Sequence, residues 1–479
     1  MSATKVLLLY PGSLWGGAWA ARPTVKPELV SLYTYLRRHD VDVDVLDLEA
    51  ELGNPAPGGQ EEFLRRAGEL IGARQFDVLS LSCWSSMQYA ATAALARQVR
   101  AERPEAIIAV GGYHVTAQPQ DFLAEDTPYT WVIAGEGEQA LVAIAAAVAG
   151  GDREAGTCRV LDGTPLPLTA ENLPDYSAYP YTRKGLAVLP VSLSRGCPYH
   201  CASCVIQPGE AGWRAFPPDE AVKLLDQVAA LEPKVIEVTD PTFGYDNLWR
   251  TPVLARLSET FRRAVPIVVT ARPDHLTRAD VDGFYTGLLR VHLDVDTLAR
   301  DLIEGLGIDP FPSKYVEHAL DIARYANAKG VPGDLNVVFG QPGETRATAA
   351  ETIERLEELM DGLPNASLAL RAKSWAYFPD GAPGVSAEAA AERFGAQIVH
   401  PEWWKEAAPY GEAAMAVVPS RDLADEAPGS DAYWRPRFTA LAAKVEAKLT
   451  ADAKRLARSH ESVGSAAEDV PHGYWHSTR

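Results

Sequence analysis

The run VSLSRGCPYHCASCVI, residues 191–206, decides how the second half of the chain is organised. It sets Cys197, Cys201 and Cys204 in a C-x3-C-x2-C spacing directly after a β-rich segment. Three thiolates on one short loop can bind three irons of a 4Fe–4S cluster and leave the fourth iron without a protein ligand. Because an open iron can bind a small molecule, this spacing predicts a cluster that does more than relay electrons.

Zinc and disulfides are the alternatives for these cysteines. His200 lies inside the motif, so a Cys3His zinc site is conceivable. Structural zinc sites usually take paired ligands from two separated hooks, and the sequence shows no second hook. Five cysteines in a chain of this length do not form a disulfide framework. The motif therefore favours the iron–sulfur interpretation.

The composition is that of a globular protein of two or three domains, with 479 residues, 47% hydrophobic and 23% charged. Its net charge of −19 argues against nucleic acid or an anionic membrane as a partner, because phosphate binding needs a basic surface. The first apolar run ends at Pro11, too short for a signal peptide or a membrane span. We expect a cytoplasmic protein, in a compartment where thiols stay reduced.

The first 150 residues alternate strand and helix patterns. The predicted strands lie within residues 5–10, 41–48, 76–83, 106–116 and 131–138. This alternation predicts a doubly wound, Rossmann-like parallel sheet, on which ligands bind at the carboxyl ends of the strands. Gly111, Gly112, Gly135 and Gly137 follow two of those ends, where glycine lets a ligand approach the backbone closely. No GxGxxG follows the first strand, so a dinucleotide is not favoured.

The remaining chain divides into three predicted parts. Residues 151–186 are rich in turn formers and read as a linker. Residues 187–382 show six further βα repeats, and residues 383–479 form a small, mainly helical C-terminal region with a helix over 436–458. The six predicted strands lie at residues 187–193, 234–238, 267–270, 289–295, 335–339 and 367–372.

The cysteine spacing resembles the signature of the radical S-adenosylmethionine (radical SAM) enzymes. The strings VGGYHVT (110–116), AGEGEQAL (134–141) and SLSCWSS (80–86), ahead of that motif, resemble the cobalamin-binding domain of the cobalamin-dependent members. The resemblance covers residues 5–380. It implies a partial (β/α)6 barrel, and three cofactors: a 4Fe–4S cluster, S-adenosylmethionine (SAM) and cobalamin.

The resemblance also implies residues that bind SAM. These are Tyr199, Asp240, Arg272, Asp296 and Gly340. Asp240 would face the cofactor, and Arg272 would reach the methionyl carboxylate or a ribose. A charged residue at a strand end is also often a solvated loop residue. One departure from the family pattern is Asp294, where glycine is expected, together with Asp296, where a longer glutamate is expected. A second is Ser203, where an aromatic residue is expected and for which Tyr199 could partly substitute.

The residues that the resemblance assigns to cobalamin lie at strand ends in the first domain. They are Ser82, Ser85, Gly111, Gly112, His114, Thr116, Gly135, Glu136 and Gly137. The DxHxxG motif that supplies a histidine to cobalt in other cobalamin proteins is absent. His114 is expected to line the mouth of the site or to pack, which leaves the hypothesis that cobalt has no histidine ligand on its lower face. Axial nitrogen hyperfine splitting in a Co(II) spectrum would count against that hypothesis.

Aromatic residues gather in the C-terminal region: Trp403, Trp404, Tyr410 and Trp434. They could line a pocket for a planar or apolar substrate. They could equally form the core of an appended domain.

The family resemblance implies a C-methyltransferase that acts on an unactivated carbon of a small molecule. It further implies natural-product or antibiotic biosynthesis and an external electron donor of the flavodoxin or ferredoxin type. One alternative is a cobalamin-binding radical SAM enzyme that catalyses a rearrangement, ring contraction or cyclisation. Another is a non-catalytic corrinoid carrier. No catalytic acid or base is assigned from the sequence.

Overall fold

The computed structural model describes residues 4–14, 25–56, 58–154, 157–204, 212–260, 265–286, 289–363, 365–379, 386–405, 415–450 and 454. It divides into two compact units. The first unit comprises Met1–Arg183, Phe378–Asp380 and Glu402–Gly411. The second comprises Lys184–Tyr377, Gly381–Pro401 and Glu412–Arg479. The division into four parts at residues 150, 186 and 382 stays a prediction.

The first unit is built on a parallel sheet with the strand order β2-β1-β3-β4-β5-β6. The strands are β1 (Lys5–Tyr10), β2 (Asp42–Asp47), β3 (Val78–Ser82), β4 (Ile107–Gly111), β5 (Trp131–Gly135) and β6 (Arg159–Gly163). The five predicted strands are confirmed. The sixth, β6, lies in the predicted linker, where a short, half-exposed edge strand leaves little hydrophobic signal.

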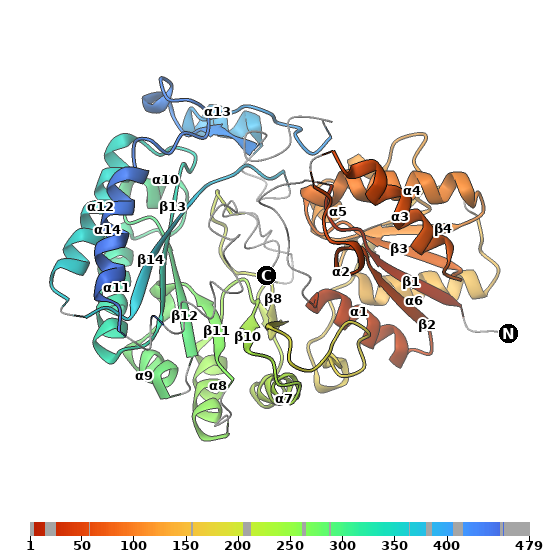
Figure 1. Ribbon diagram of the computed structural model, residues 1–479, viewed down its shortest axis with the longest axis horizontal. Helices are drawn as coiled ribbons and strands as arrows, with labels where there is room; N and C mark the ends of the chain where they lie inside the picture. Colours follow the sequence, from red (N-terminus) through yellow and green to blue (C-terminus); the bar gives the residue numbers. More distant parts are fainter. Residues whose placement is uncertain are drawn as a thin grey trace. The chain divides into compact units, whose positions relative to one another are not determined.

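Helices cover both faces of this sheet, α3 and α4 on one side and α1 and α6 on the other (Figure 1). The helices are α1 (Pro27–Arg38), α2 (Leu48–Leu52), α3 (Gln60–Gly72), α4 (Tyr89–Glu102), α5 (Tyr113–Ala117) and α6 (Gly137–Ala149), with short 3-10 turns η1 (Ser86–Gln88), η2 (Pro119–Phe122) and η3 (Ala170–Asn172). Leu7 and Leu9 of β1 pack in one core with Phe63 of α3 and Leu95 of α4. This buried core makes the sheet a rigid support for the loops at its carboxyl edge.

The second unit contains a parallel sheet with the order β14-β13-β12-β11-β10-β7, the predicted partial barrel. Its strands are β7 (Val188–Val191), β10 (Val235–Val238), β11 (Ile267–Ala271), β12 (Leu289–Asp296), β13 (Gly333–Phe339) and β14 (Leu368–Ser374). A small ribbon of β8 (Ser194–Arg195) and β9 (Arg214–Ala215) flanks the cysteine loop. Each of the six predicted strands of this half is present.

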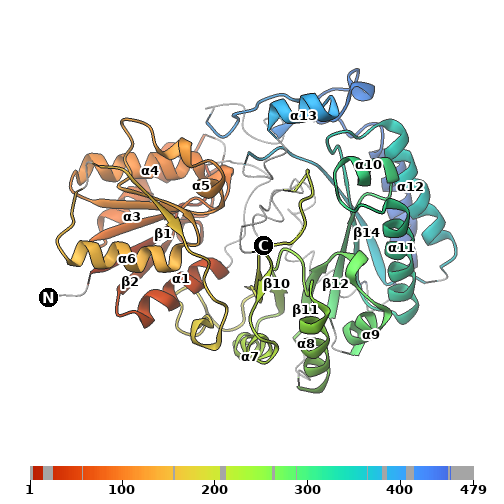
Figure 2. The same cartoon turned by 180° about the vertical axis from the view of Figure 1, so that it is seen from behind.

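Helices lie on the outer side of this curved sheet (Figure 2). They are α7 (Pro218–Ala229), α8 (Asn247–Thr260), α9 (Arg278–Thr286), α10 (Arg300–Gly305), α11 (Pro312–Lys329) and α12 (Arg346–Asp361), with the turn η4 (Pro273–His275). Along β12, the buried apolar Val291 and Leu293 alternate with the buried polar Arg290 and His292. One side of the sheet is therefore an apolar core and the other carries charges.

Those charges are paired across neighbouring strands. Arg290 donates to both carboxylate oxygens of Asp334 at 3.1 and 2.9 Å, and His292 Nδ1 lies 2.8 Å from the same carboxylate. Asn336 donates to Asp294 at 2.7 Å. A bulge between Asp294 and Asp296 ends the regular pairing of β12 with β13. Asp296 has a φ of 58°, in the left-handed region that is uncommon for residues other than glycine.

The C-terminal region is mainly helical, as predicted, and also contains a short antiparallel strand pair. It contains α13 (Ala387–Phe394), β15 (Gln397–Ile398), β16 (Val417–Val418), the turn η7 (Arg421–Leu423) and α14 (Arg435–Lys448). The ring of Trp434 stacks on Phe339 at the end of β13, with centroids 4.4 Å apart. No helix among the described residues is long and apolar enough to cross a lipid bilayer.

Candidate active site

The cysteine loop follows β7. It is hydrogen-bonded to residues that follow β12, β13 and β14 in the sequence. The backbone N–H of Ala202 donates to Leu306 O at 2.8 Å. The Ser203 hydroxyl donates to Gln341 Oε1 at 2.9 Å, and Trp375 Nε1 donates to Ser203 O at 2.9 Å. Leu306, Gln341 and Trp375 follow α10, β13 and β14. Parallel strands bring these distant segments to one edge, so the loop lies where a barrel carries its functional groups.

The three thiols differ in exposure. Cys201 is buried, whereas Cys197 and Cys204 are half-buried. Burial raises the pKa of Cys197, and it raises the pKa of Cys201 to about 11 although Arg272 opposes the shift. None of the five cysteines, all of which are described, is in a disulfide. A bound iron would have to supply the charge that makes these thiols thiolates.

Three thiols on one loop are the donor set that a 4Fe–4S cluster with one open iron requires, so the residues fit that group. A zinc site gains no support. His200, the fourth ligand that a Cys3His zinc site would need, is exposed.

Asp240 follows β10 and supports the start of the cysteine loop. Its carboxylate accepts hydrogen bonds from Leu193 N at 2.7 Å, Ser194 N at 3.0 Å and Ser194 Oγ at 2.6 Å. The side chain is buried, and burial raises its pKa to about 7 despite these donors. The structure therefore shows a contact with the loop backbone, while a contact with SAM stays a prediction.

Arg272 follows β11 and lies against the cysteine loop. Its guanidinium donates to both carboxylate oxygens of Asp274 at 2.9 Å, to Ile308 O at 3.1 Å and to Cys201 Sγ at 3.3 Å. The guanidinium carbon lies 3.7 Å from the centroid of the Tyr199 ring. Two residues that the sequence assigned to SAM, Tyr199 and Arg272, are thus in contact with each other and with the loop.

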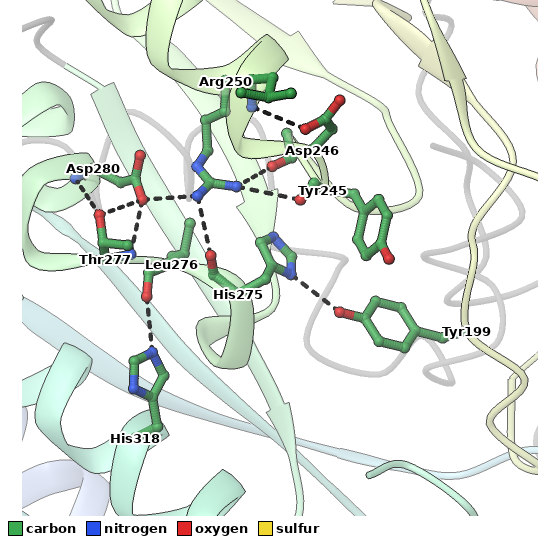
Figure 3. A network of polar contacts seen from close by, with 11 residues as sticks. Tyr199, Tyr245, Asp246, Arg250, His275, Leu276, Thr277, Asp280 and His318 are labelled. Atoms are coloured by element: carbon green, nitrogen blue, oxygen red, sulfur yellow. Dashed lines mark hydrogen bonds and ion pairs between the residues drawn. The ribbon is translucent and has the colours of Figure 1, made fainter.

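A buried arginine that sequence reasoning missed joins the loops after β10 and β11 (Figure 3). Arg250 of α8 donates to the carbonyl oxygens of Gly244 and His275 and to Asp280 Oδ2, the latter two at 3.0 and 2.9 Å. The His275 ring lies 3.5 Å from the Tyr199 hydroxyl, and burial lowers its pKa to about 4. Arg250 thereby supports the side of Tyr199 through His275. An arginine on a helix gives no sequence signal of this role.

The loop after β13, GQPGET at residues 340–345, is anchored by residues of the C-terminal region. Gly340 has a φ of 78° and donates its N–H to Glu344 Oε1 at 2.8 Å. The same oxygen accepts the Tyr433 hydroxyl, and Ser420 Oγ donates to Glu344 O at 2.5 Å. Burial raises the pKa of Glu344 to about 8. Glu344 was not predicted as a site residue, because its burial depends on the distant Tyr433.

Two glycines at the carboxyl edge of the first unit have no room for a side chain. A Cβ at Gly112 (φ 128°) would lie 2.4 Å from Cys83 O, and one at Gly135 (φ 105°) would lie 2.6 Å from Gly163 O. Thr116 Oγ1 joins the two loops, since it donates to Gly112 O and accepts Gly135 N, both at 2.9 Å. Packing inside the first unit therefore requires glycine at both positions, and close approach of a ligand to this edge stays a prediction.

The other residues assigned to cobalamin contact or terminate neighbouring elements of the first unit. Ser85 caps η1 together with Gln88. Glu136 accepts Leu166 N at 2.6 Å, and Gly137 begins α6. Ser82 and Gly111 are the last residues of β3 and β4. All of them lie at the carboxyl ends of β3, β4 or β5.

His114 is fully buried and packs inside the first unit. Its Nδ1 lies 3.0 Å from Ser86 Oγ and its Nε2 lies 3.4 Å from Asp121 Oδ2. Asp121 also accepts Trp404 Nε1 and Lys405 Nζ, each at 2.7 Å. The segment that carries Trp404 is in this way tied to the sheet edge of the first unit.

The C-terminal aromatics are buried packing residues where they are described. Trp403 packs on Phe378, Trp404 lies beside His114 with ring centroids 5.8 Å apart, and Trp434 stacks on Phe339. Tyr410 lies outside the described residues. The described members thus form parts of cores.

Comparison with protein families finds one matching family in each of the two units. A B12 binding domain matches residues 22–145, and the radical SAM superfamily matches residues 191–356. The chain therefore carries a cobalamin-binding domain followed by a radical SAM domain. A 4Fe–4S cluster, SAM and cobalamin are accordingly the cofactors of an enzyme with these two domains.

Known relatives of the radical SAM enzyme include methyltransferases. An uncharacterized methyltransferase of Pyrococcus horikoshii, PH0819, is 22% identical over 390 residues, which are 75% of this chain and 79% of the relative. Two structures of TsrM, a radical SAM methyltransferase from Kitasatospora setae, share its fold. One holds tryptophan and a SAM analogue, with a TM-score of 0.62, 18% identity and coverage of 81% of this chain and 77% of TsrM. The other holds cobalamin and a 4Fe–4S cluster, with a TM-score of 0.59, 17% identity and coverage of 81% and 79%.

Proposed function

We propose that the enzyme is a cobalamin-dependent radical SAM C-methyltransferase that methylates an unactivated carbon of a small molecule. The observation that carries the proposal is the pairing of a B12-binding domain with a radical SAM domain whose three cysteines lie at the carboxyl edge of the barrel strands. The methyltransferase relatives support the reaction type. Natural-product or antibiotic biosynthesis is the proposed setting.

The ligands are assigned to residues at the two sheet edges. Cys197, Cys201 and Cys204 would hold the cluster. SAM would bind beside Tyr199, Asp240, Arg272, Asp296 and Gly340. Cobalamin would bind over the loops of Gly112, Thr116 and Gly135, with Ser82, Ser85, Gly111, His114, Glu136 and Gly137 around them.

The cofactors would supply methyl transfer from SAM and a carbon radical on the substrate, and the protein would supply placement. Asp240 and Gln341 hold the two ends of the cysteine loop, since they contact Ser194 and Ser203. The loops of Gly112 and Gly135 would lie against the corrin. An external low-potential electron donor, of the flavodoxin or ferredoxin type, would reduce the cluster.

The test begins with the protein reconstituted without oxygen with iron, sulfide and hydroxocobalamin. Iron and sulfide are counted, and the optical spectrum reports cobalamin. Methyl-labelled SAM, a chemical reductant and tryptophan, the substrate bound to TsrM, are then added. We expect label in a methylated product, or release of S-adenosylhomocysteine that requires cobalamin. The variant with Cys197→Ala, Cys201→Ala and Cys204→Ala should keep cobalamin and lose iron, sulfide and product.

The outcomes separate the competing functions. Release of 5′-deoxyadenosine without S-adenosylhomocysteine would overturn methyl transfer in favour of a rearrangement, ring contraction or cyclisation. Cobalamin without iron or sulfide in the wild-type protein would favour a corrinoid carrier. Full activity of the triple variant would refute a cluster-based reaction altogether.

A further inference from the structure

The resemblance assigns Arg272 to the carboxylate or a ribose of SAM, but its side chain already makes several contacts within the protein. A guanidinium has five N–H donors, and four of those of Arg272 are occupied within the protein. Two form the fork to Asp274, one reaches Ile308 O and one reaches Cys201 Sγ at 3.3 Å. Little donor capacity is left for the carboxylate of SAM.

The guanidinium is also held on its faces. It lies over the Tyr199 ring at 3.7 Å and near the Tyr315 ring at 5.7 Å. The Tyr315 hydroxyl is itself bonded to Val295 O at 2.9 Å. The side chain of Arg272 is only 11% exposed. The N–H that points at Cys201 is therefore fixed in direction rather than carried on a swinging side chain.

A fixed donor at a ligand sulfur affects the redox chemistry of a cluster. Reduction potentials of iron–sulfur clusters depend on net charge, on hydrogen bonds to the sulfurs and on solvent exposure. A hydrogen bond to sulfur stabilises the reduced state, which carries one more negative charge. Because Asp274 offsets the charge of Arg272, the directed N–H is the main contribution that the pair makes.

We propose that Arg272 is a positioning residue that raises the reduction potential of the cluster through its hydrogen bond to Cys201, with Asp274 holding the donor in place. This inference rests on the proposed ligation by Cys197, Cys201 and Cys204. The step concerned is the entry of one electron from a low-potential donor into the oxidised cluster. No proton moves and no bond forms or breaks in that step.

The test is a redox titration of the reconstituted holoenzyme, with dithionite as the reductant, followed by electron paramagnetic resonance in the absence of SAM. Iron and sulfide are counted first. Arg272→Gln removes the charge and the fork, and Arg272→Lys keeps the charge but loses the fork. Arg278→Gln is the matched control, because Arg278 is exposed and pairs with Asp321 on the protein surface.

We expect the equilibrium constant for reduction to fall at least tenfold in Arg272→Gln, which is 59 mV toward negative potential for one electron. Arg272→Lys should shift in the same direction, and Arg278→Gln should not shift. A fully loaded Arg272→Gln protein with an unchanged potential would overturn the inference. SAM binding to the same loaded variants is measured separately by equilibrium dialysis, and weaker binding with an unchanged potential would return Arg272 to the role of a carboxylate ligand.

Failures of loading are also decisive. A wild-type protein without iron and sulfide would overturn the proposed function rather than the role of Arg272. If Arg272→Gln folds like the wild type but does not take up iron and sulfide, the reduction potential of Arg272→Lys tests the inference instead. If neither variant loads, Arg272 shapes the loop, and the redox assignment is wrong.

Discussion

The hydroxyl of Ser194 donates to the carboxylate of Asp240 at 2.6 Å, in a pair that joins the start of the cysteine loop to the end of β10. The second oxygen of the same carboxylate accepts two backbone N–H groups, those of Leu193 and Ser194. A buried acid is thus used to fix the backbone that leads into the cysteines. This makes the geometry of the loop depend on one side chain 43 residues after Cys197 in the sequence.

Replacement of Asp240 should destabilise the cysteine loop, and more so when both carboxylate oxygens that accept its hydrogen bonds are removed. Asp240→Ala leaves three buried donors without partners, and each costs about 1–3 kcal/mol. Asp240→Asn keeps an oxygen for the two N–H groups, and the Ser194 hydroxyl can rotate to accept from the new amide. We expect rapid hydrogen–deuterium exchange of residues 191–200 and poor iron loading in Asp240→Ala only. Equal exchange in the two variants would contradict the role assigned to the carboxylate.

Glu344 should make the stability of the protein depend on pH. Burial raises its pKa to about 8, above the ordinary value of 4.5. Between those values the folded protein holds a proton that the unfolded chain has released, so stability falls as the pH rises toward 8 and then levels. The slope is at most about 1.4 kcal/mol per pH unit.

Glu344→Gln stays neutral and keeps an oxygen for Gly340 N, so it should remove this part of the slope. Urea unfolding at pH 5 and pH 8.5 measures it. Asp240 contributes a slope of the same sign in both proteins, so the difference between wild type and variant isolates Glu344. Glu358→Gln, which removes an exposed carboxylate from α12, the helix that follows Glu344, serves as the control. Identical slopes in wild type and Glu344→Gln would refute the raised pKa.

Asp121 should hold the segment of Trp404 and Lys405 in the first unit. Although burial opposes it, hydrogen bonds from His114, Lys405 and Trp404 lower the pKa of Asp121. The stabilisation is therefore present at neutral pH and is lost as the pH falls through the lowered pKa. Asp121→Ala leaves a buried indole N–H without its acceptor and should cost about 2–4 kcal/mol.

A red shift of tryptophan fluorescence at neutral pH would report the released Trp404. Glu402→Gln is the control, because the side chain of Glu402 is 63% exposed and pairs with the same Lys405. A surface pair of that kind contributes only about 0–1 kcal/mol. Fluorescence of Asp121→Ala that matches the wild type would show that the segment is held by other contacts.

Gly112→Ala should damage the carboxyl edge of the first unit. Its φ of 128° disfavours any side chain, and the new Cβ would lie 2.4 Å from a backbone oxygen that cannot rotate away. We expect a loss of at least about 2 kcal/mol and weak retention of cobalamin after gel filtration. Gly72→Ala at the end of α3, where nothing lies within 4 Å, should bind cobalamin like the wild type. Full retention by Gly112→Ala would place the cobalamin elsewhere.

The candidate site was only partly predictable from the sequence. The cysteine loop and the glycine pairs follow strand ends, and parallel topology places strand ends at one edge. Arg250 and Glu344 could not be predicted as site residues. A charged residue on a helix or loop is expected to be exposed to solvent, and only distant partners in the fold bury these two. His114 was ambiguous for the same reason, and only Asp121, Ser86 and Trp404 place it inside a core.

The sequence by itself determined the class of the fold and the place of the three cysteines after the first strand of the second sheet. Short apolar runs that alternate with helical patterns predict buried parallel strands from local sequence. The spacing of Cys197, Cys201 and Cys204 is likewise a local property of one loop. The tertiary structure alone decided what Asp240, Arg272 and Glu344 contact. Their partners are tens of residues away, and the hydrogen bonds of a buried charge exist only after the strands have brought those partners together.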